Sequence, residues 1–281
     1  MNFSVKSFTN RIVKKIKNQL VLLNKPSGEQ CPVCGRKKII FEPLSDYYWQ
    51  KWDSTGFIYS IFQAETLNFL NFSCSNCGAS DRDRLFAIYL EPLLKGSSNI
   101  KLLDFAPSKT LRNLFFSKFK NLEYRTADLE MPGVDDYVDI QDLAIYQDNS
   151  WDGIICSHVL EHVPDDQKAL KELYRILKPE GWAVLMVPIF LDVKETHEIS
   201  NIDDSAEEDR WKYFGQGDHL RMYSKADFLN RIKNAGFSVN EYGVDYFGEL
   251  SFKTYGIHPR SVLYVATKSS INSSTSQAKR N

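Results

Sequence analysis

The 281-residue chain has no run of about 18 or more apolar residues, so it offers no candidate for a membrane-spanning helix. It has no excess of charge of one sign either: 35 Lys and Arg residues against 36 Asp and Glu residues give a net charge of −1. A general nucleic-acid binder needs a basic surface, and this balance argues against one. The apolar run Leu20–Leu23 is too short for a signal-peptide core and has no small-residue cleavage site. These absences predict a cytoplasmic protein.

What is present is the composition of a folded protein, with 43% hydrophobic and 25% charged residues. The length favours one large domain with a small one beside it. Residues 1–24 are expected to form an amphipathic helix, because Phe8, Ile12 and Ile16 recur every four residues among lysines. Such a helix either packs on its own protein or makes a peripheral contact with an anionic membrane surface. The polar residues 269–281 are predicted to be disordered.

Four of the five cysteines form two pairs, Cys31 with Cys34 and Cys74 with Cys77, and a glycine follows each pair. In a reducing cytoplasm such CxxC pairs indicate a metal site rather than disulfides. Four thiolates complete the tetrahedral shell of zinc and leave no open position, so the zinc is predicted to be structural. The 39 residues between Cys34 and Cys74 exceed the usual spacing of a zinc ribbon. The ribbon, predicted over residues 25–98 together with a linker helix, must therefore carry an inserted hairpin or loop.

Residues 99–268 alternate between predicted strands and predicted helices. Strands are expected over residues 101–105, 123–127, 151–157, 182–188, 237–242 and 261–267, and helices over residues 110–119, 165–177 and 225–235. Before them, the linker helix over residues 82–95 is expected to bend or end at Pro92. Gly181 marks the expected stop of the helix that precedes the fourth strand. Residues 189–222 are polar and poorly periodic, and we expect an insertion over the edge of the sheet. The alternation predicts an α/β fold with a mostly parallel sheet covered on both faces.

Acidic residues follow the first strands of this unit. Asp104 ends the first strand, just before a tight loop and a helix, which is where open α/β sheets bind ligands. Asp128 ends the second strand, and a carboxylate there can accept hydrogen bonds from both hydroxyls of a ribose. Asp139 precedes the next strand. Together the three acids predict a ribose-containing ligand at this edge of the sheet.

Several motifs of the unit stand in a fixed order. They are LLDFAP from residue 102, YRTADL from 124, VDI from 138, SWDGIICSHVLEHV from 150, RILKPEG from 175 and AGF from 235. In this order and spacing the chain resembles the class I S-adenosylmethionine-dependent methyltransferases, and within them the methyltransferase type 11 group with an N-terminal zinc ribbon. The resemblance covers residues 99–268 and the ribbon. It implies a Rossmann-like sheet of seven strands, mostly parallel, with helices on both faces, and S-adenosyl-L-methionine as the cofactor.

The resemblance also implies roles for residues at matching positions. Asp104 would lie near the methionine end of the cofactor, Asp128 would bind the ribose and Asp139 the adenine. Ser157 and His158 would lie beside the transferred methyl group. The complete set of cofactor-binding residues implied in this way is Asp104, Phe105, Ala106, Pro107, Asp128, Leu129, Asp139, Ile140 and Ser157.

One departure from the family concerns its first loop, which is usually glycine-rich with the pattern GxGxG. In this chain residues 106–110 read APSKT. A pyrophosphate needs the close backbone approach that glycine permits, whereas S-adenosylmethionine has no phosphate. The departure therefore counts against a nicotinamide-dependent oxidoreductase more than against a methyltransferase. It also leaves open a zinc-ribbon adaptor, a pseudoenzyme whose sheet domain does not catalyse.

The most reactive cluster has the pattern HxxEH, with His158, Glu161 and His162 on one face of a helical turn. Inverted zinc proteases share these letters but need a downstream helix ligand and a different fold. Small-RNA 2′-O-methyltransferases and some ubiquinone-pathway O-methyltransferases carry a similar ExxEH metal site, which suggests a second divalent metal with His219 as a fourth ligand. Alternatively, His158 or His219 acts as a base without metal, or Glu161 and His162 only pack near the adenine. The candidate catalytic residues are therefore His158, Glu161, His162 and His219.

The sequence thus predicts an S-adenosylmethionine-dependent methyltransferase with a structural zinc ribbon. Similar zinc-ribbon enzymes occur among surface-polysaccharide genes, so the resemblance suggests O-methylation of a small molecule, a sugar or a glycan. Three arginines, Arg82, Arg84 and Arg221, are candidates for binding an anionic acceptor. The rival classes are the adaptor and the nicotinamide enzyme, and calorimetry with each cofactor would separate them.

Overall fold

The computed structural model describes residues 29–96 and 99–269. The predicted N-terminal helix lies outside these residues, as does the predicted C-terminal tail apart from Ser269. Among the described residues, no helix is both long enough and apolar enough to cross a lipid bilayer.

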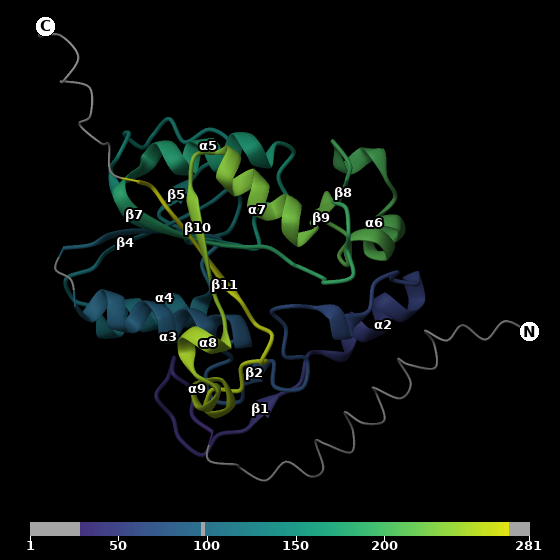
Figure 1. Ribbon diagram of the computed structural model, residues 1–281, viewed down its shortest axis with the longest axis horizontal. Helices are drawn as coiled ribbons and strands as arrows, with labels where there is room; N and C mark the ends of the chain where they lie inside the picture. Colours follow the sequence, from purple (N-terminus) through teal and green to yellow (C-terminus); the bar gives the residue numbers. More distant parts are fainter. Residues whose placement is uncertain (1–28, 97–98, 270–281) are drawn as a thin grey trace, which may run out of the picture.

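A seven-stranded sheet forms the centre of the protein (Figure 1). Its strands are β3 (Lys101–Phe105), β4 (Glu123–Asp128), β5 (Asp136–Tyr137), β6 (Trp151–Ser157), β7 (Leu177–Met186), β10 (Ser238–Tyr242) and β11 (Leu263–Thr267). Their order is β10-β11-β7-β6-β3-β4-β5, and β11 is antiparallel to both of its neighbours. The other pairings are parallel. The predicted Rossmann-like, mostly parallel sheet is therefore confirmed, and the strand order reverses between β3 and β6, where such folds bind ligands.

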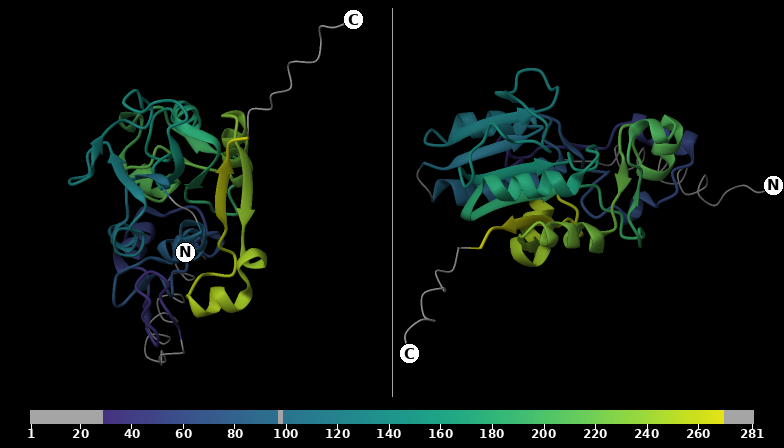
Figure 2. Two further views of the ribbon diagram at one scale, coloured as in Figure 1. Left: turned by 90° about the vertical axis from the view of Figure 1, so that its left-hand side faces the viewer. Right: turned by 90° about the horizontal axis from the view of Figure 1, so that it is seen from above.

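Helices cover both faces of the sheet, as Figures 1 and 2 show. Helices α3 (Asp81–Lys95) and α4 (Lys109–Lys118) lie on one face, and α5 (Asp166–Ile176) and α7 (Lys225–Asn234) lie on the other. Helix α5 forms because Asp165 caps its first turn by accepting a hydrogen bond from the Lys168 amide. Its apolar stripe of Ala169, Leu173 and Ile176 is fully buried against the sheet.

Two predicted boundaries differ from the structure, an end of α3 at Pro92 and the start of β7. Helix α3 continues past Pro92 to Lys95, because the missing N–H lies near the helix end and the Gly96 amide still donates to the Pro92 carbonyl. Helix α5 ends at Ile176, one residue before its predicted end, but β7 begins at Leu177, five residues before its predicted start at residue 182. The extra residues of β7 form an irregular pairing with β6, which periodicity in the sequence does not reveal.

The cysteine-bearing segment lies beneath α3 and holds a two-stranded antiparallel sheet of β1 (Phe41–Glu42) and β2 (Ser73–Cys74). The insertion between them, residues 43–72, contains helix α2 (Asp46–Thr55) and a 3-10 turn (Ile61–Gln63), not the expected hairpin or loop. Two short helices near the C-terminus, α8 (Val244–Phe247) and α9 (Glu249–Thr254), lie beside this segment (Figure 1).

A second insertion, residues 189–222, follows β7. It contains β8 (His197–Glu198), a 3-10 turn (Ile202–Asp204), α6 (Glu207–Phe214) and β9 (Arg221–Met222). Helices α2 and α6 lie side by side (Figure 1), and Phe57, Phe190 and Phe214 share an apolar cluster between the two insertions. The second insertion therefore packs beyond the carboxyl end of β7 against the first one, rather than along the edge of the sheet.

Candidate functional site

The four paired cysteines converge at one point. The Sγ atoms of Cys31 and Cys77 lie 3.8 Å apart, and those of Cys34 and Cys74 lie 4.0 Å apart. All four sulfurs lie within 4.8 Å of one another. Four thiolates about 2.3 Å from a tetrahedral zinc stand about 3.8 Å apart, so the donor set and its spacing fit one zinc ion. The glycine after each pair has a positive φ, 72° at Gly35 and 77° at Gly78, as the tight turn of a metal knuckle requires.

Arg84, a candidate for anion binding, instead lies buried beneath this centre with no exposed surface. Its guanidinium stacks on the Phe41 ring at 4.0 Å from the centroid. It donates five hydrogen bonds to the carbonyl oxygens of Asn71, Phe72, Ala79, Tyr255 and Gly256. Arg84 therefore joins the cysteine segment to the turn after α9, and the prediction that it binds an acceptor is wrong.

Arg221 is also buried, with 3% of its surface exposed. It donates to the carbonyl oxygens of Leu160, Val163 and Pro164 and pairs with Glu198. It therefore fixes the loop after β6 and does not face an acceptor, which leaves Arg82 as the candidate among the three arginines.

The first loop, residues 106–110, forms its tight turn without the glycines of the family pattern. Ala106 stands where the family pattern has its first glycine, and it adopts a φ of +51°, which costs a residue with a side chain about 1–2 kcal/mol. Ser108 caps helix α4, and the Thr110 hydroxyl donates to the Asp83 carboxylate at 2.9 Å. The two polar residues at later glycine positions thus tie α4 to the first turn of α3. Phe105 and Pro107 of the same loop are buried.

Asp104 is 2% exposed and accepts a hydrogen bond from the Tyr124 hydroxyl at 2.7 Å. Burial raises the pKa of this carboxyl to about 7; the Tyr124 hydrogen bond opposes the rise, and the nearby Asp83 carboxylate adds to it. Two carboxylates thus lie close together at the carboxyl end of β3. A cationic group bound there would favour the ionised form of Asp104.

The predicted ribose and adenine positions lie at the carboxyl end of β4 and in the loop after β5. One oxygen of Asp128 accepts hydrogen bonds from the Glu130 and Met131 amides, and no described residue donates to its other oxygen. Leu129 is 62% exposed although it is apolar. Asp139 accepts from the Gln141 amide, while Ile140 is buried. An acid with a free oxygen beside an exposed leucine fits a ribose and the face of an adenine.

Ser157 and His158 end strand β6 at the strand-order reversal. The Ser157 hydroxyl is buried and, among the described residues, has no hydrogen-bond partner, so a polar ligand group would satisfy it. His158 has a φ of +58°, held by its amide hydrogen bond to the Met186 carbonyl at 2.8 Å. Burial lowers the pKa of His158 to about 4, and the positive charge of Arg82 adds to the shift. The imidazole is therefore neutral near pH 7 and can accept a proton.

The other candidate catalytic residues gather behind His158. His162 and His219 meet edge to face, with ring centroids 4.7 Å apart. Glu161 has no exposed surface, and one of its oxygens lies 3.2 Å from His158 Nδ1 and 4.0 Å from His162 Nε2. The structure thus brings all four predicted residues together, although the ligand atoms of only Glu161, His162 and His219 form one compact group.

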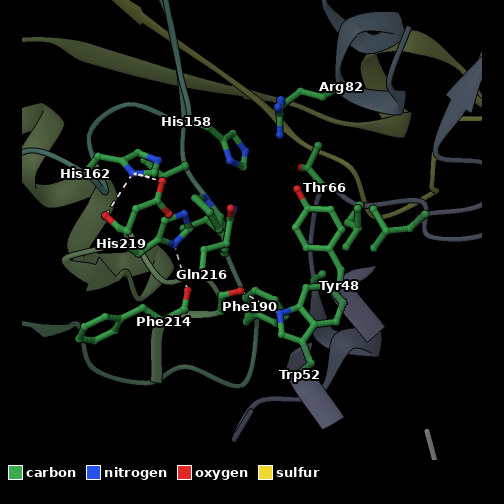
Figure 3. A pocket seen from close by; sticks show the side chains of 18 of the residues that line it. Tyr48, Trp52, Thr66, Arg82, His158, His162, Phe190, Phe214, Gln216 and His219 are labelled. Atoms are coloured by element: carbon green, nitrogen blue, oxygen red, sulfur yellow. Dashed lines mark hydrogen bonds and ion pairs between the residues drawn. The ribbon is translucent and has the colours of Figure 1, made fainter. Parts of the chain in front are cut away.

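A cavity of about 370 Å³ opens in front of these histidines. Figure 3 shows His162 and His219 on one side of it, Tyr48 and Trp52 from α2 on the other, and Arg82 at one end. The remaining wall includes Leu44, Thr66, Leu67, Phe190, Phe214, Gln216 and Asp218. The two insertions therefore build a chamber at the carboxyl end of β6.

Most residues of this chamber were missed in the sequence. Tyr48 and Trp52 belong to an insertion whose abundance of aromatic residues was visible but unassigned, and Gln216 belongs to a segment without periodicity. Asp83, which completes the acidic pair with Asp104, was also missed. The only feature that singles Asp83 out in the sequence is its spacing from Ser80, with which it forms the capping box of α3.

The chain is similar to known methyltransferases over part of its length. Among curated relatives, the ubiquinone/menaquinone biosynthesis C-methyltransferase of Haemophilus ducreyi is 31% identical over 110 residues, which cover 35% of this chain and 42% of that protein. The enzyme of the same name from Rickettsia akari is 32% identical over 120 residues, or 42% of this chain and 39% of that protein. The alignments therefore span less than half of the length of these relatives.

Similar solved structures include a SAM dependent methyltransferase from Archaeoglobus fulgidus, with a TM-score of 0.43, 14% identity, and coverage of 66% of this chain and 91% of that one. Another is phosphoethanolamine N-methyltransferase 2 of Haemonchus contortus, with a TM-score of 0.40, 14% identity, and coverage of 62% and 50%. Residues 80–242, more than half of the chain, match the protein family described as Methyltransferase domain. On that match, and with a sheet whose order and single reversed strand agree with the fold expected of it, the chain belongs to the methyltransferase-domain family.

Proposed function

We propose that this protein is an S-adenosylmethionine-dependent methyltransferase that transfers the methyl group to a hydroxyl of a sugar or glycan. The observation that carries the proposal is the chamber at the carboxyl end of β6. It opens at His158, one residue after the unpartnered Ser157 hydroxyl. A cofactor on one side of this strand end and an acceptor on the other would place donor and acceptor in line.

The charge of the cofactor site supports a cationic ligand. Asp83 and Asp104 lie together at the end of β3, and Asp128 and Asp139 follow at the next strand ends. S-adenosylmethionine carries a sulfonium and an ammonium group, which such acids attract, whereas a pyrophosphate would be repelled. The same set of residues therefore argues against a nicotinamide dinucleotide.

S-adenosylmethionine, when bound, supplies a methyl group on a positively charged sulfur. The protein must align the acceptor with that methyl group and remove the proton of the acceptor hydroxyl. His158 fits the second task, because its ring is neutral near pH 7, lines the chamber and is held in place by the backbone of β7.

The chamber supports a sugar as the acceptor. Aromatic faces at Tyr48, Trp52 and Phe190 can stack on the C–H face of a pyranose, while Gln216 offers hydrogen bonds to its hydroxyls. Arg82 at one end would pair with a carboxylate or phosphate on the sugar. The mixture of flat apolar walls and scattered polar groups is typical of sites that orient a polar ring.

Replacing Asp128 tests the cofactor site. We expect Asp128→Ala to weaken the binding of S-adenosylhomocysteine about tenfold to a hundredfold, because hydrogen bonds to a charged acceptor are worth roughly 1.5–3 kcal/mol. Isothermal calorimetry measures this affinity. The exposed Asp203, which lies on the second insertion, serves as the matched control, and Asp203→Ala should bind like the wild type. If both variants bound S-adenosylhomocysteine with equal affinity, Asp128 would not be the residue that binds the ribose. Binding of a nicotinamide dinucleotide by the wild type would overturn the proposed cofactor.

Replacing Trp52 tests the acceptor chamber. Transfer of labelled methyl from S-adenosylmethionine to sugars, nucleotide sugars, glycans, quinols and nucleotides would first identify an acceptor. With it, Trp52→Ala should raise the KM for the acceptor about tenfold or more, because a stacked aromatic surface is lost, and leave the affinity for the cofactor unchanged. Trp49, on the same helix but not in the chamber wall, provides the control Trp49→Ala. A methyl group found on carbon rather than oxygen would contradict O-methylation and favour the chemistry named for the relatives.

We also propose that the four cysteines hold one structural zinc ion. Their sulfur spacing fits a tetrahedral ion, and all four ligand positions are taken by the protein, so the ion would have no position open for an acceptor. Its task would be to hold the ends of the insertion that carries α2.

A further inference from the structure

The carboxylate of Glu161 occupies an unusual position in the loop after β6. It has no exposed surface, and neither oxygen has a hydrogen-bond donor among the residues described. The nearest nitrogen, Nδ1 of His158, lies 3.2 Å away but outside hydrogen-bond geometry. A buried carboxylate without donors is costly unless a cation compensates it. No lysine or arginine forms an ion pair with it in the described part of the chain.

The two histidines beside Glu161 are held with one nitrogen free. Nδ1 of His219 lies 3.0 Å from the Phe214 carbonyl oxygen, so Nδ1 must carry the proton and donate it. Nε2 of His219 is therefore a lone pair, and it is buried without a partner. In His162, Nδ1 lies 3.3 Å from the Asp218 carbonyl oxygen, which again leaves Nε2 as the acceptor. This fixed tautomer is the arrangement that metal-binding histidines show.

We propose that Glu161, His162 and His219 bind one divalent transition-metal ion at the wall of the chamber. One ligand atom from each residue lies within 4.8 Å of the others. Ligands at about 2.0–2.1 Å from an ion stand roughly 3.0–3.4 Å apart, so a contraction of about an ångström closes the site. Two imidazoles and one carboxylate suit Zn²⁺, Mn²⁺, Fe²⁺ or Co²⁺ better than Mg²⁺ or Ca²⁺, which prefer oxygen ligands.

The position of the site gives the ion a task, which rests on the proposed function. His162 and His219 both line the chamber, so the open positions of the ion would face the acceptor. An acceptor hydroxyl bound there would lose its proton more readily, and His158 would take that proton. The oxygen would then form a bond to the methyl carbon while the bond between that carbon and the sulfonium sulfur breaks, and the sulfur keeps the electron pair. The products would be a methyl ether, neutral S-adenosylhomocysteine and a protonated His158.

The test is a titration of zinc-loaded protein with Co²⁺, followed by visible absorption. We expect one Co²⁺ to bind per chain and to give d–d bands of nitrogen and oxygen ligation. A thiolate-to-cobalt charge-transfer band should not appear, because zinc keeps the cysteine site. Glu161→Gln and His162→Gln should each weaken Co²⁺ binding by at least about tenfold. His162 is partly exposed, so its variant should fold even if the Glu161 variant does not.

The matched control is His197→Gln, which changes an exposed histidine of β8 that is outside the three-residue group and should leave Co²⁺ affinity unchanged. Absence of bound Co²⁺ in the zinc-loaded wild type would overturn the proposal, as would Co²⁺ binding that survives both Glu161→Gln and His162→Gln. Calorimetry with S-adenosylhomocysteine on the same samples separates the two proposals. Cofactor binding without Co²⁺ binding refutes only the metal site, and the reverse refutes only the methyltransferase.

Discussion

Arg84→Met is expected to lower the free energy of unfolding by about 3–5 kcal/mol, which is the range for removing one partner from a buried charged network. Methionine keeps the apolar stem but leaves the half-buried carbonyl oxygens of Asn71, Phe72 and Tyr255 without a donor. The carbonyl oxygens of Ala79 and Gly256 keep one donor each, the Cys74 amide and the Asn68 side chain. Each unsatisfied group costs about 1–3 kcal/mol before the loops relax. Urea denaturation followed by fluorescence measures the difference.

Arg82 is the natural control for this variant, because it lies two residues away on α3 but faces the chamber. Arg82→Met should change stability by less than about 0.5 kcal/mol, the usual size of a surface substitution. A second variant, Arg84→Lys, keeps the charge but cannot reach five acceptors with one ammonium group, so it should stay destabilised. If Arg84→Met cost less than about 1 kcal/mol, the guanidinium would not hold the cysteine segment to the turn after α9.

The second large effect is expected at the metal centre. Cys74→Ser should reduce bound zinc from about one ion per chain to a small fraction and lower the melting temperature, because structural zinc contributes directly to folding. Cys74 lies in β2 opposite Phe41 of β1, so loss of the ion also removes an anchor of the small sheet. Metal analysis and thermal denaturation record the two changes.

Cys156 provides the control, since it is equally buried but lies within β6 of the central sheet. Cys156→Ala should leave a small cavity and some loss of stability, yet retain the zinc. The insertion between the zinc pairs carries Tyr48 and Trp52. Any folded Cys74→Ser protein should therefore lose acceptor binding while keeping its affinity for S-adenosylhomocysteine. A stable wild-type protein without zinc would contradict the proposed centre.

The parts of the fold that were predictable are those with short-range signals. Apolar runs that end in Asp104 and Asp128 identify strands, and the period of α5 identifies its buried stripe. The end of α5 was predicted to within one residue, but the start of β7 was missed, because residues 177–181 read as a helix stop while pairing of Leu177 with Trp151 of β6 makes them extended. Helix α2 was missed because its aromatic residues have no clear helical period, and its packing partners lie about 160 residues away.

The candidate site, too, was predictable from the sequence only in part. Residues within one motif, such as His158, Glu161 and His162, could be selected from their spacing, but which nitrogen each ring leaves free depends on carbonyl groups of the second insertion. Arg84 and Arg221 read as surface cations, because a sequence does not show that loops supply carbonyl acceptors for a buried guanidinium. Burial of charge is a tertiary property, and only the assembled loops reveal it.

The contacts that cover the cysteine centre also set an order of events during synthesis. Arg84 and its partner Tyr255 are 171 residues apart in the chain, and Gln30 donates to Thr254 from still farther away. A ribosome that adds about 5–20 residues per second needs roughly 10–30 s to bridge that interval. Throughout it the thiols are in place but the cover from α9 has not yet emerged. The nascent chain therefore meets zinc, or an oxidant, with an uncovered centre, whereas in the finished protein Cys31 and Cys74 are 0% and 2% exposed. Supply of the metal thus matters most while the protein is being made, because afterwards an ion can reach the centre only from the side of the exposed Cys34 and the half-buried Cys77.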